Sequence, residues 1–169
     1  MMWKSAVAIV AVFTLVNCSG SSSKTAASTT LRPTIDPCTL LTAQDASKLI
    51  GKPVKRATPA GSSGPLCMYA AGTTAGAEIT VRLDADAPTA HSDFPTWVQP
   101  FPGRAAGLTV TSVPNLGHEA SATHNLNVND AVYVRRGAAL MKIGAYPAVA
   151  DAALIAAART ALGRIKSAG

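Results

Sequence analysis

The sequence predicts a single α+β domain, in which an antiparallel β-sheet of five or six strands has helices packed on one face. Three observations indicate this fold class. Several segments after residue 65 alternate apolar and polar residues, as strands with one buried face do. The chain closes with a long segment of helical period. The ~135 residues from position 35 onward are enough for one hydrophobic core and too few for two domains.

The first predicted element is a short helix over residues 43–50. Thr42 and Asp45 have the S/T-x-x-D/E spacing of a helix N-terminal cap, and Gly51 suits the left-handed residue that follows a helix end. Two strands follow, at residues 66–70 and 77–84, and the second alternates cleanly. The next segment is expected to be an irregular connection or a short helix whose aromatic residues fill the core, and it comprises residues 88–107 with Phe94, Trp97 and Phe101.

The C-terminal half is more regular. Four further strands are predicted, at residues 108–113, 122–128, 132–135 and 138–143. A final helix begins at Asp151, which we expect to cap it, and carries basic residues in its last turns. Its apolar residues recur at helical spacing and should form one buried stripe, made of Leu154, Ile155, Ala158, Ala161, Leu162 and Ile165.

The first 17 residues have the pattern of an export signal. A short segment with Lys4 precedes eleven apolar residues (6–16), which is too short for the ~20 residues that span a bilayer. Leu15, Val16 and Cys18 match the lipobox of bacterial lipoproteins, whereas Asn17 departs from it. We therefore expect lipidation of Cys18. The alternative is an ordinary secretory signal that is cleaved a few residues later.

The cysteine count supports the lipid anchor. An exported chain meets an oxidising compartment, where an odd cysteine must be consumed in some way. If Cys18 carries a thioether, Cys38 and Cys67 remain as a disulfide pair, and neither belongs to a C-x-x-C redox motif. The residues that follow Cys18, up to position 34, are rich in Ser, Thr and Ala and should form a flexible tether to a domain spanning residues 35–169.

Several short motifs together resemble a known family. They are DPCTLLT at residues 36–42, Gly51, Cys67 shortly before a tyrosine, LGHEA at 116–120, VRRG at 134–137 and LGRI at 162–165. In these motifs the chain is similar to actinobacterial, especially mycobacterial, lipoproteins that share a domain of unknown function. The resemblance covers residues ~35–166. It implies an envelope lipoprotein, a disulfide between the positions of Cys38 and Cys67, and no known chemistry.

No catalytic or metal-binding constellation is predicted, and no cofactor. The most suggestive segment runs from His118 and Glu119 to His124, but its spacing misses the H-E-x-x-H zinc motif. We expect an exposed His118 at a turn and a partly buried His124. Asp84 and Asp86 lie two residues apart near a strand end, which suits either a weak cation site or a solvated turn.

The net charge is +6, and removal of residues 1–17 would take away one Lys. This balance favours anionic partners, such as phospholipid head groups or phosphorylated glycans. The alternative is ordinary solubilising charge that also protects sheet edges. The candidate cations are Lys52, Lys55, Arg56, Arg135 and Arg136. Nucleic acid is not an expected partner, because the chain is exported and has few aromatic residues to stack on bases.

These features predict a protein anchored to the cell membrane through lipid and facing the envelope or the extracellular side. Its domain is expected to bind or sense a ligand without catalysis. The alternatives are an accessory subunit that stabilises an envelope protein complex and, third, an enzyme with an unrecognised site. An apolar pocket would favour the first function, a flat apolar patch the second, and titratable groups converging in a cleft the third.

Overall fold

The computed structural model describes residues 35–58, 65–99, 107–125 and 130–165. The chain divides into two units, Met1–Arg32 and Pro33–Gly169, and every described residue belongs to the second. The predicted signal peptide (residues 1–17) and tether (residues 18–34), including Cys18, lie outside the described residues. In the described part of the chain, no helix is both long and apolar enough to cross a membrane.

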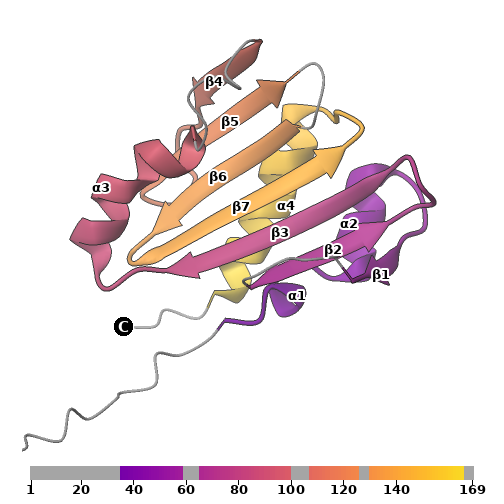
Figure 1. Ribbon diagram of the computed structural model, residues 1–169, viewed down its shortest axis with the longest axis horizontal. Coiled ribbons are helices and arrows are strands. Elements are labelled where there is room, and N and C mark those ends of the chain that lie inside the picture. Colours follow the sequence, from indigo (N-terminus) through magenta and orange to yellow (C-terminus); the bar gives the residue numbers. More distant parts are fainter. Residues whose placement is uncertain (1–34, 59–64, 100–106, 126–129, 166–169) are drawn as a thin grey trace, which may run out of the picture. The chain divides into compact units, whose positions relative to one another are not determined.

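One seven-stranded antiparallel sheet forms the body of the second unit (Figure 1). The strands are β1 (Lys55–Ala57), β2 (Leu66–Ala70), β3 (Gly76–Leu83), β4 (Leu108–Ser112), β5 (Glu119–Asn125), β6 (Asp130–Arg136) and β7 (Ala139–Tyr146). Their order across the sheet is β1-β2-β3-β7-β6-β5-β4. The α+β class is confirmed, with seven strands instead of five or six. The strand that the sequence does not reveal is β1, because its three residues are Lys, Arg and Ala and show no apolar alternation.

Among the described residues, four helices accompany the sheet. Figure 1 shows α2 and α4 behind the sheet and α3 in front. The helices are α1 (Pro37–Leu40), α2 (Ala43–Ile50), α3 (Ala87–Val98) and α4 (Asp151–Arg164). The short α1 was not expected from the sequence. Its start is nevertheless well specified, because the Asp36 side chain accepts a hydrogen bond from the Cys38 N–H at 2.9 Å and Pro37 occupies the first helical position.

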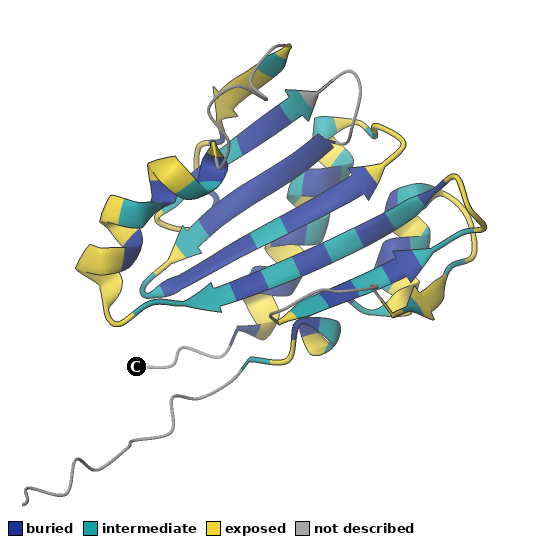
Figure 2. Cartoon of the chain, in the orientation of Figure 1, coloured by how far each residue is buried: buried dark blue, intermediate teal, exposed yellow. Residues whose placement is uncertain are grey.

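We call the face of the sheet that carries α1, α2 and α4 the covered face. On β3, for example, Ala77, Ile79 and Val81 point into this core, and their polar neighbours point away. The apolar stripe predicted for the last helix is confirmed, since its members are buried or half-buried against the sheet. Figure 2 shows the resulting alternation of buried and half-buried residues along β3 and β2.

We call the other side of the sheet the open face, and α3 packs on part of it. Ala90, Phe94 and Val98 of α3 form a second apolar cluster with residues of β6 and β7. The expectation that the helices pack on one face is therefore wrong for α3. The physical reason is that β6 and β7 are apolar on both sides, with five consecutive buried residues in β6, so both of their faces need cover. The strand-side members of the cluster are Ala131, Tyr133 and Leu140.

The ends of α2 match the prediction, whereas the start of α4 does not. Thr42 and Asp45 form a capping box, and Gly51 follows α2 in the left-handed conformation with φ +71°. At α4, Ala150 is the N-cap residue and makes no side-chain capping bond. Asp151 is instead the first helical residue, where its charge still complements the helix dipole.

The predicted disulfide between Cys38 and Cys67 is present and joins α1 to β2, with a Cα–Cα distance of 5.2 Å. Next to it, the Tyr69 hydroxyl donates a hydrogen bond of 2.7 Å to the backbone carbonyl of Leu41. Both contacts hold the N-terminal helices against the covered face. Since the loop-entropy model assigns about 3.5 kcal/mol to closing a loop of 29 residues, the bridge makes a large contribution for a domain of this size.

The turn between β4 and β5 approaches β6 closely at Gly117. This residue has φ +69°, and a Cβ there would lie 2.6 Å from both the Arg135 carbonyl oxygen and Val134 Cγ1. The adjacent His118 N–H donates a hydrogen bond of 2.8 Å to the same Arg135 carbonyl. Only glycine satisfies both the left-handed conformation and this close approach.

Candidate functional site

The open face carries a hollow over β2, β3 and β7, and α3 contributes none of its lining residues. The strand register brings Met68, Glu78 and Gly144 into one row across these strands, and it brings Gly76 and Tyr146 into the next row. Because side chains alternate along each strand, all of these positions lie on the open face. Residues from three strands thus surround one small area of the sheet.

The hollow has a volume of about 230 Å³, and its lining is mostly apolar. Its floor is low because Ala70, Gly76 and Gly144 contribute little or no side chain. Gly76 is required by the backbone itself, since a Cβ at this position would lie 2.7 Å from the Tyr69 carbonyl oxygen. The floor of the hollow at Gly76 is therefore set by the packing of β2 against β3.

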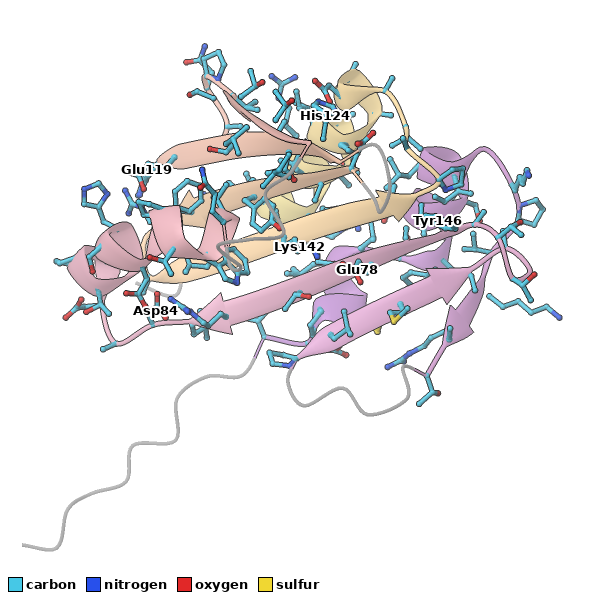
Figure 3. The ribbon with its side chains drawn as sticks, turned by 45° about the horizontal axis from the view of Figure 1, so that its top comes forward. Glu78, Asp84, Glu119, His124, Lys142 and Tyr146 are labelled. Atoms are coloured by element: carbon cyan, nitrogen blue, oxygen red, sulfur yellow. A yellow bond between two sulfur atoms is a disulfide. The ribbon has the colours of Figure 1, made fainter. Side chains whose placement is uncertain are left out.

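Tyr146 and Glu78 line the hollow, and Lys142, which is not one of the lining residues, is linked to it through its ion pair with Glu78. Tyr146 stands at one end with 51% of its surface exposed, so much of its side chain is accessible to a ligand. Farther along the strands, Lys142 Nζ and Glu78 Oε1 form an ion pair at 2.5 Å, and both side chains are about three-quarters buried. Figure 3 shows Glu78 and Lys142 next to each other, with Tyr146 farther along β7. A ligand in the hollow would therefore meet the aromatic ring of Tyr146 and an ion pair without net charge, in which Lys142 donates hydrogen bonds and Glu78 accepts them.

A second group of polar side chains links α3 to the far strands. Glu119 pairs with Arg135 Nε at 2.7 Å and with His91 Nδ1 at 2.5 Å. Burial raises the pKa of Glu119, but the hydrogen bonds and charges of Arg135 and His91 outweigh it, so the pKa lies below the usual value. A carboxylate held ionised in this way is a structural anion and a poor general acid at neutral pH.

A hollow of about 360 Å³ adjoins this group, lined by residues of α3 and of the β4–β5 hairpin. Its titratable side chains are Glu119 and His118. Glu119 is already engaged, and His118 Nδ1 accepts a hydrogen bond of 3.1 Å from the Gly137 N–H. In this hollow, the described residues thus do not combine a nucleophile with a base in hydrogen-bond contact, as covalent catalysis needs.

A histidine on the covered face joins two carboxylates. His124 lies 3.2 Å from Asp130 through Nδ1 and 2.9 Å from Asp151 through Nε2, and so links β5 to β6 and to the start of α4. Burial lowers the pKa of His124, but the hydrogen bonds and charges of Asp151 and Asp130 more than offset it, and the pKa is raised. His124 therefore has a structural role, because it connects β5 to β6 and to α4.

The structure agrees with the expected positions of the two histidines of the H-E segment. His118 is exposed in the turn before β5, and His124 is half-buried on β5. Within the described ranges, no group of three or more His, Cys, Asp or Glu side chains is arranged to hold a metal ion.

Asp84 and Asp86, the two aspartates considered as a weak cation site, form contacts within the domain instead. Asp84 pairs with Arg82 Nε at 2.7 Å, and Arg82 also reaches Asp93 at 2.6 Å. Asp86 caps α3 by accepting a hydrogen bond of 2.8 Å from the Thr89 N–H. The two carboxylates therefore have separate partners.

The five candidate cations are not gathered into one patch. Lys55 and Arg56 are successive residues of the edge strand β1 and project to opposite faces, as do Arg135 and Arg136 on β6. Four strand spacings, or ~19 Å, separate β1 from β6 in the sheet. Both arginines of β6 also form bonds within the domain. Lys52 and Lys55 are exposed, so any contact with an anionic surface would depend on that end of the sheet.

The residues around the hollow were not identified from the sequence. The last predicted strand ends at residue 143, three positions before Tyr146, and the alternation of residues 77–84 places Glu78 only on the solvent-facing side of a strand. One signal was available, because Lys142 interrupts an otherwise apolar strand, ALMKIGAY. A charged residue at such a position needs a partner on the same face, and the sequence alone does not name it.

No protein-family model matches the chain, and no curated protein or solved structure shows significant similarity to it.

Proposed function

We propose that this chain is a lipid-anchored protein of the cell envelope whose folded domain binds a ligand without catalysing a reaction. In this proposal, residues 1–17 direct export, Cys18 carries the lipid, and residues 18–34 tether the domain formed by residues 35–169. The partners are the membrane, through the lipid, and a ligand held on the open face of the sheet.

The observation that carries the ligand-binding part is the hollow beside Tyr146. Binding sites are typically concave, mainly apolar and supplied with a few placed polar groups, and this hollow has all three properties. Two other polar groups of the described domain, around Glu119 and around His124, are engaged in ion pairs and support the fold. This distribution supports a binding function over a catalytic one.

The cysteines support the anchor. The disulfide between Cys38 and Cys67 consumes two of the three cysteines and leaves Cys18 unpaired. A disulfide is typical of proteins that have left the reducing cytosol. Two or more acyl chains on the remaining cysteine would give a stable membrane anchor, whereas one chain gives only marginal binding.

Fractionation of cells that express the wild-type chain or the Cys18→Ser variant tests the anchor. We expect the wild type in the membrane fraction and the variant in the medium or the soluble fraction. Ser19→Ala is a matched control, because it alters the neighbouring residue and leaves the thiol intact. Membrane retention of Cys18→Ser equal to that of the wild type would contradict the anchor.

The second candidate is an accessory subunit of an envelope complex, and the strand β4 favours it. This strand ends the sheet order, its residues LTVTS carry no charge, and Val110 is 38% exposed. Uncharged edge strands readily accept a further strand from a partner. Crosslinking at Thr109 or Thr111 in intact cells would yield a partner protein if this function applies, and only the free chain if it does not.

A further inference from the structure

We propose that the hollow on the open face binds one pyranose ring of a neutral glycan. In this arrangement the ring stacks on Tyr146, and its hydroxyl groups bond to the pair of Glu78 and Lys142. The inference rests on the proposed ligand-binding function and specifies the class of ligand for that site.

The size of the hollow favours a single ring. Sites for drug-sized ligands measure ~300–1,000 Å³, and this hollow of about 230 Å³ is smaller. Its floor is formed by strand backbone at Gly76 and Gly144, so a flat group can approach the sheet closely. A shallow site of this kind holds one unit of a longer chain, while the neighbouring units extend into solvent.

Tyr146 supplies the stacking surface. It is one of two large apolar side chains that are exposed among the described residues, and the other, Val110, lies on β4 at the far side of the sheet. The face of an aromatic ring carries partial negative charge, and the C–H groups on one side of a pyranose ring carry partial positive charge. The two surfaces are both flat and electrostatically complementary.

The ion pair supplies the polar contacts. Glu78 accepts hydrogen bonds and Lys142 donates them, and their separation of 2.5 Å places the two functions next to each other. Neighbouring sugar hydroxyl groups each donate and accept, so they can bond to both members without separating them. Hydrogen bonds to charged groups are stronger than those between neutral groups.

The same pair disfavours two other ligand classes. An acyl chain would cover Glu78 and Lys142 without offering them hydrogen bonds, and such desolvation is costly. A charged ligand would compete with the existing pair for one of its members. A neutral polyol with an apolar side avoids both costs, and a pyranose ring is the common biological group with this character.

The test uses the full chain purified in detergent and labelled for NMR. It is titrated separately with maltohexaose, cellohexaose, α-1,6-mannohexaose and palmitate, and the amide signals of Gly76 and Gly144 are followed. We expect at least one oligosaccharide to shift both signals. The Tyr146→Ala variant should bind it about tenfold more weakly, the loss that corresponds to ~1.4 kcal/mol, whereas Tyr146→Phe should stay within about threefold of the wild type.

Val110→Ala is the matched control, since it removes the other exposed apolar side chain and should leave the affinity unchanged. Lys142→Met should weaken binding even though Tyr146 is intact. The inference is overturned if no oligosaccharide shifts the two signals, or if Tyr146→Ala binds as well as the wild type. Shifts caused by palmitate alone would overturn the glycan while leaving the ligand-binding function in place. If neither sugar nor lipid shifts the signals, ligand binding at this hollow fails as well.

Discussion

The covered face and the open face of the sheet differ in how completely helices bury them. Three helices pack on the covered face, and its core contains 23 buried residues among those that the structure describes. On the open face, α3 forms a cluster with six buried residues, over β6 and β7. The part over β2 and β3 instead carries half-buried side chains, an ion pair and the hollow.

Under the proposed function, this difference separates the residues that determine stability from those that bind the ligand. The covered face has the continuous apolar packing from which most folding free energy comes. The open face places Gly, Glu, Lys and Tyr where a fully packed sheet would have apolar side chains, and a binding surface has this composition. Substitutions on the first face should therefore change mainly stability, and substitutions around the hollow should change mainly binding.

The largest expected effect is a difference in stability between two substitutions on opposite faces of the β2–β3 pair. Ile79→Ala removes a side chain that is fully buried on the covered face and should lower the free energy of unfolding by about 4 kcal/mol. Met68→Ala, on the open face, removes a half-buried side chain and should cost about 1 kcal/mol or less. Urea unfolding of both variants measures the difference. Equal losses would show that the two faces contribute alike.

The next effect concerns the turn that closes against the covered core. Gly117→Ala should destabilise the domain by about 3 kcal/mol for two reasons. The new Cβ would lie 2.6 Å from atoms of Arg135 and Val134, and alanine would have to adopt the left-handed backbone conformation. Gly137→Ala is the matched control: its φ is +59°, but a Cβ there meets no atom within 4 Å, so only ~1 kcal/mol should be lost. Thermal unfolding of the two variants compares them, and equal losses would refute the close approach.

A smaller effect should appear as a pH dependence of the covered face. In the folded state, burial lowers the pKa of His124, but Asp151 and Asp130 raise it by more, so the pKa lies above its usual value. The stabilisation is therefore complete below the unfolded pKa of ~6.5 and is lost as the pH rises through the higher folded pKa. Between pH 6 and pH 8, unfolding experiments should show falling stability for the wild type and a flatter profile for His124→Gln.

His118→Gln serves as the control for that profile, because His118 is exposed and its Nδ1 accepts a hydrogen bond from a backbone N–H, whereas His124 faces two carboxylates. It should keep the pH slope of the wild type. If His124→Gln keeps the same slope too, the two carboxylates do not hold His124 as the structure indicates.

Local patterns in the sequence were sufficient for most elements. The capping residues Thr42 and Asp45 fixed α2, and the alternation of Ile79 and Val81 with polar residues fixed β3. Cysteine counting identified the bridge of Cys38 to Cys67. These features depend on residues close together in the chain or on pairing by elimination.

Features that depend on long-range packing could not be predicted in this way. The placement of α3 on the open face follows from the two-sided burial of β6 and β7, which is known only once their neighbours in the sheet are known. The hollow likewise depends on the register that aligns Gly76 with Tyr146 and Glu78 with Gly144. A shift of one residue in that register would place these side chains on the covered face.

The most direct test of the division between the two faces is native mass spectrometry of the full chain purified from the cells that produce it. Wild type and Tyr146→Ala are compared under identical conditions, and equal unfolding midpoints establish that both are folded. We expect the wild type to carry a noncovalent adduct, distinct from the covalent lipid that we propose at Cys18, and the variant to lack most of that adduct. The absence of an adduct from the wild type, or equal occupancy in the two proteins, would contradict a binding role for the open face.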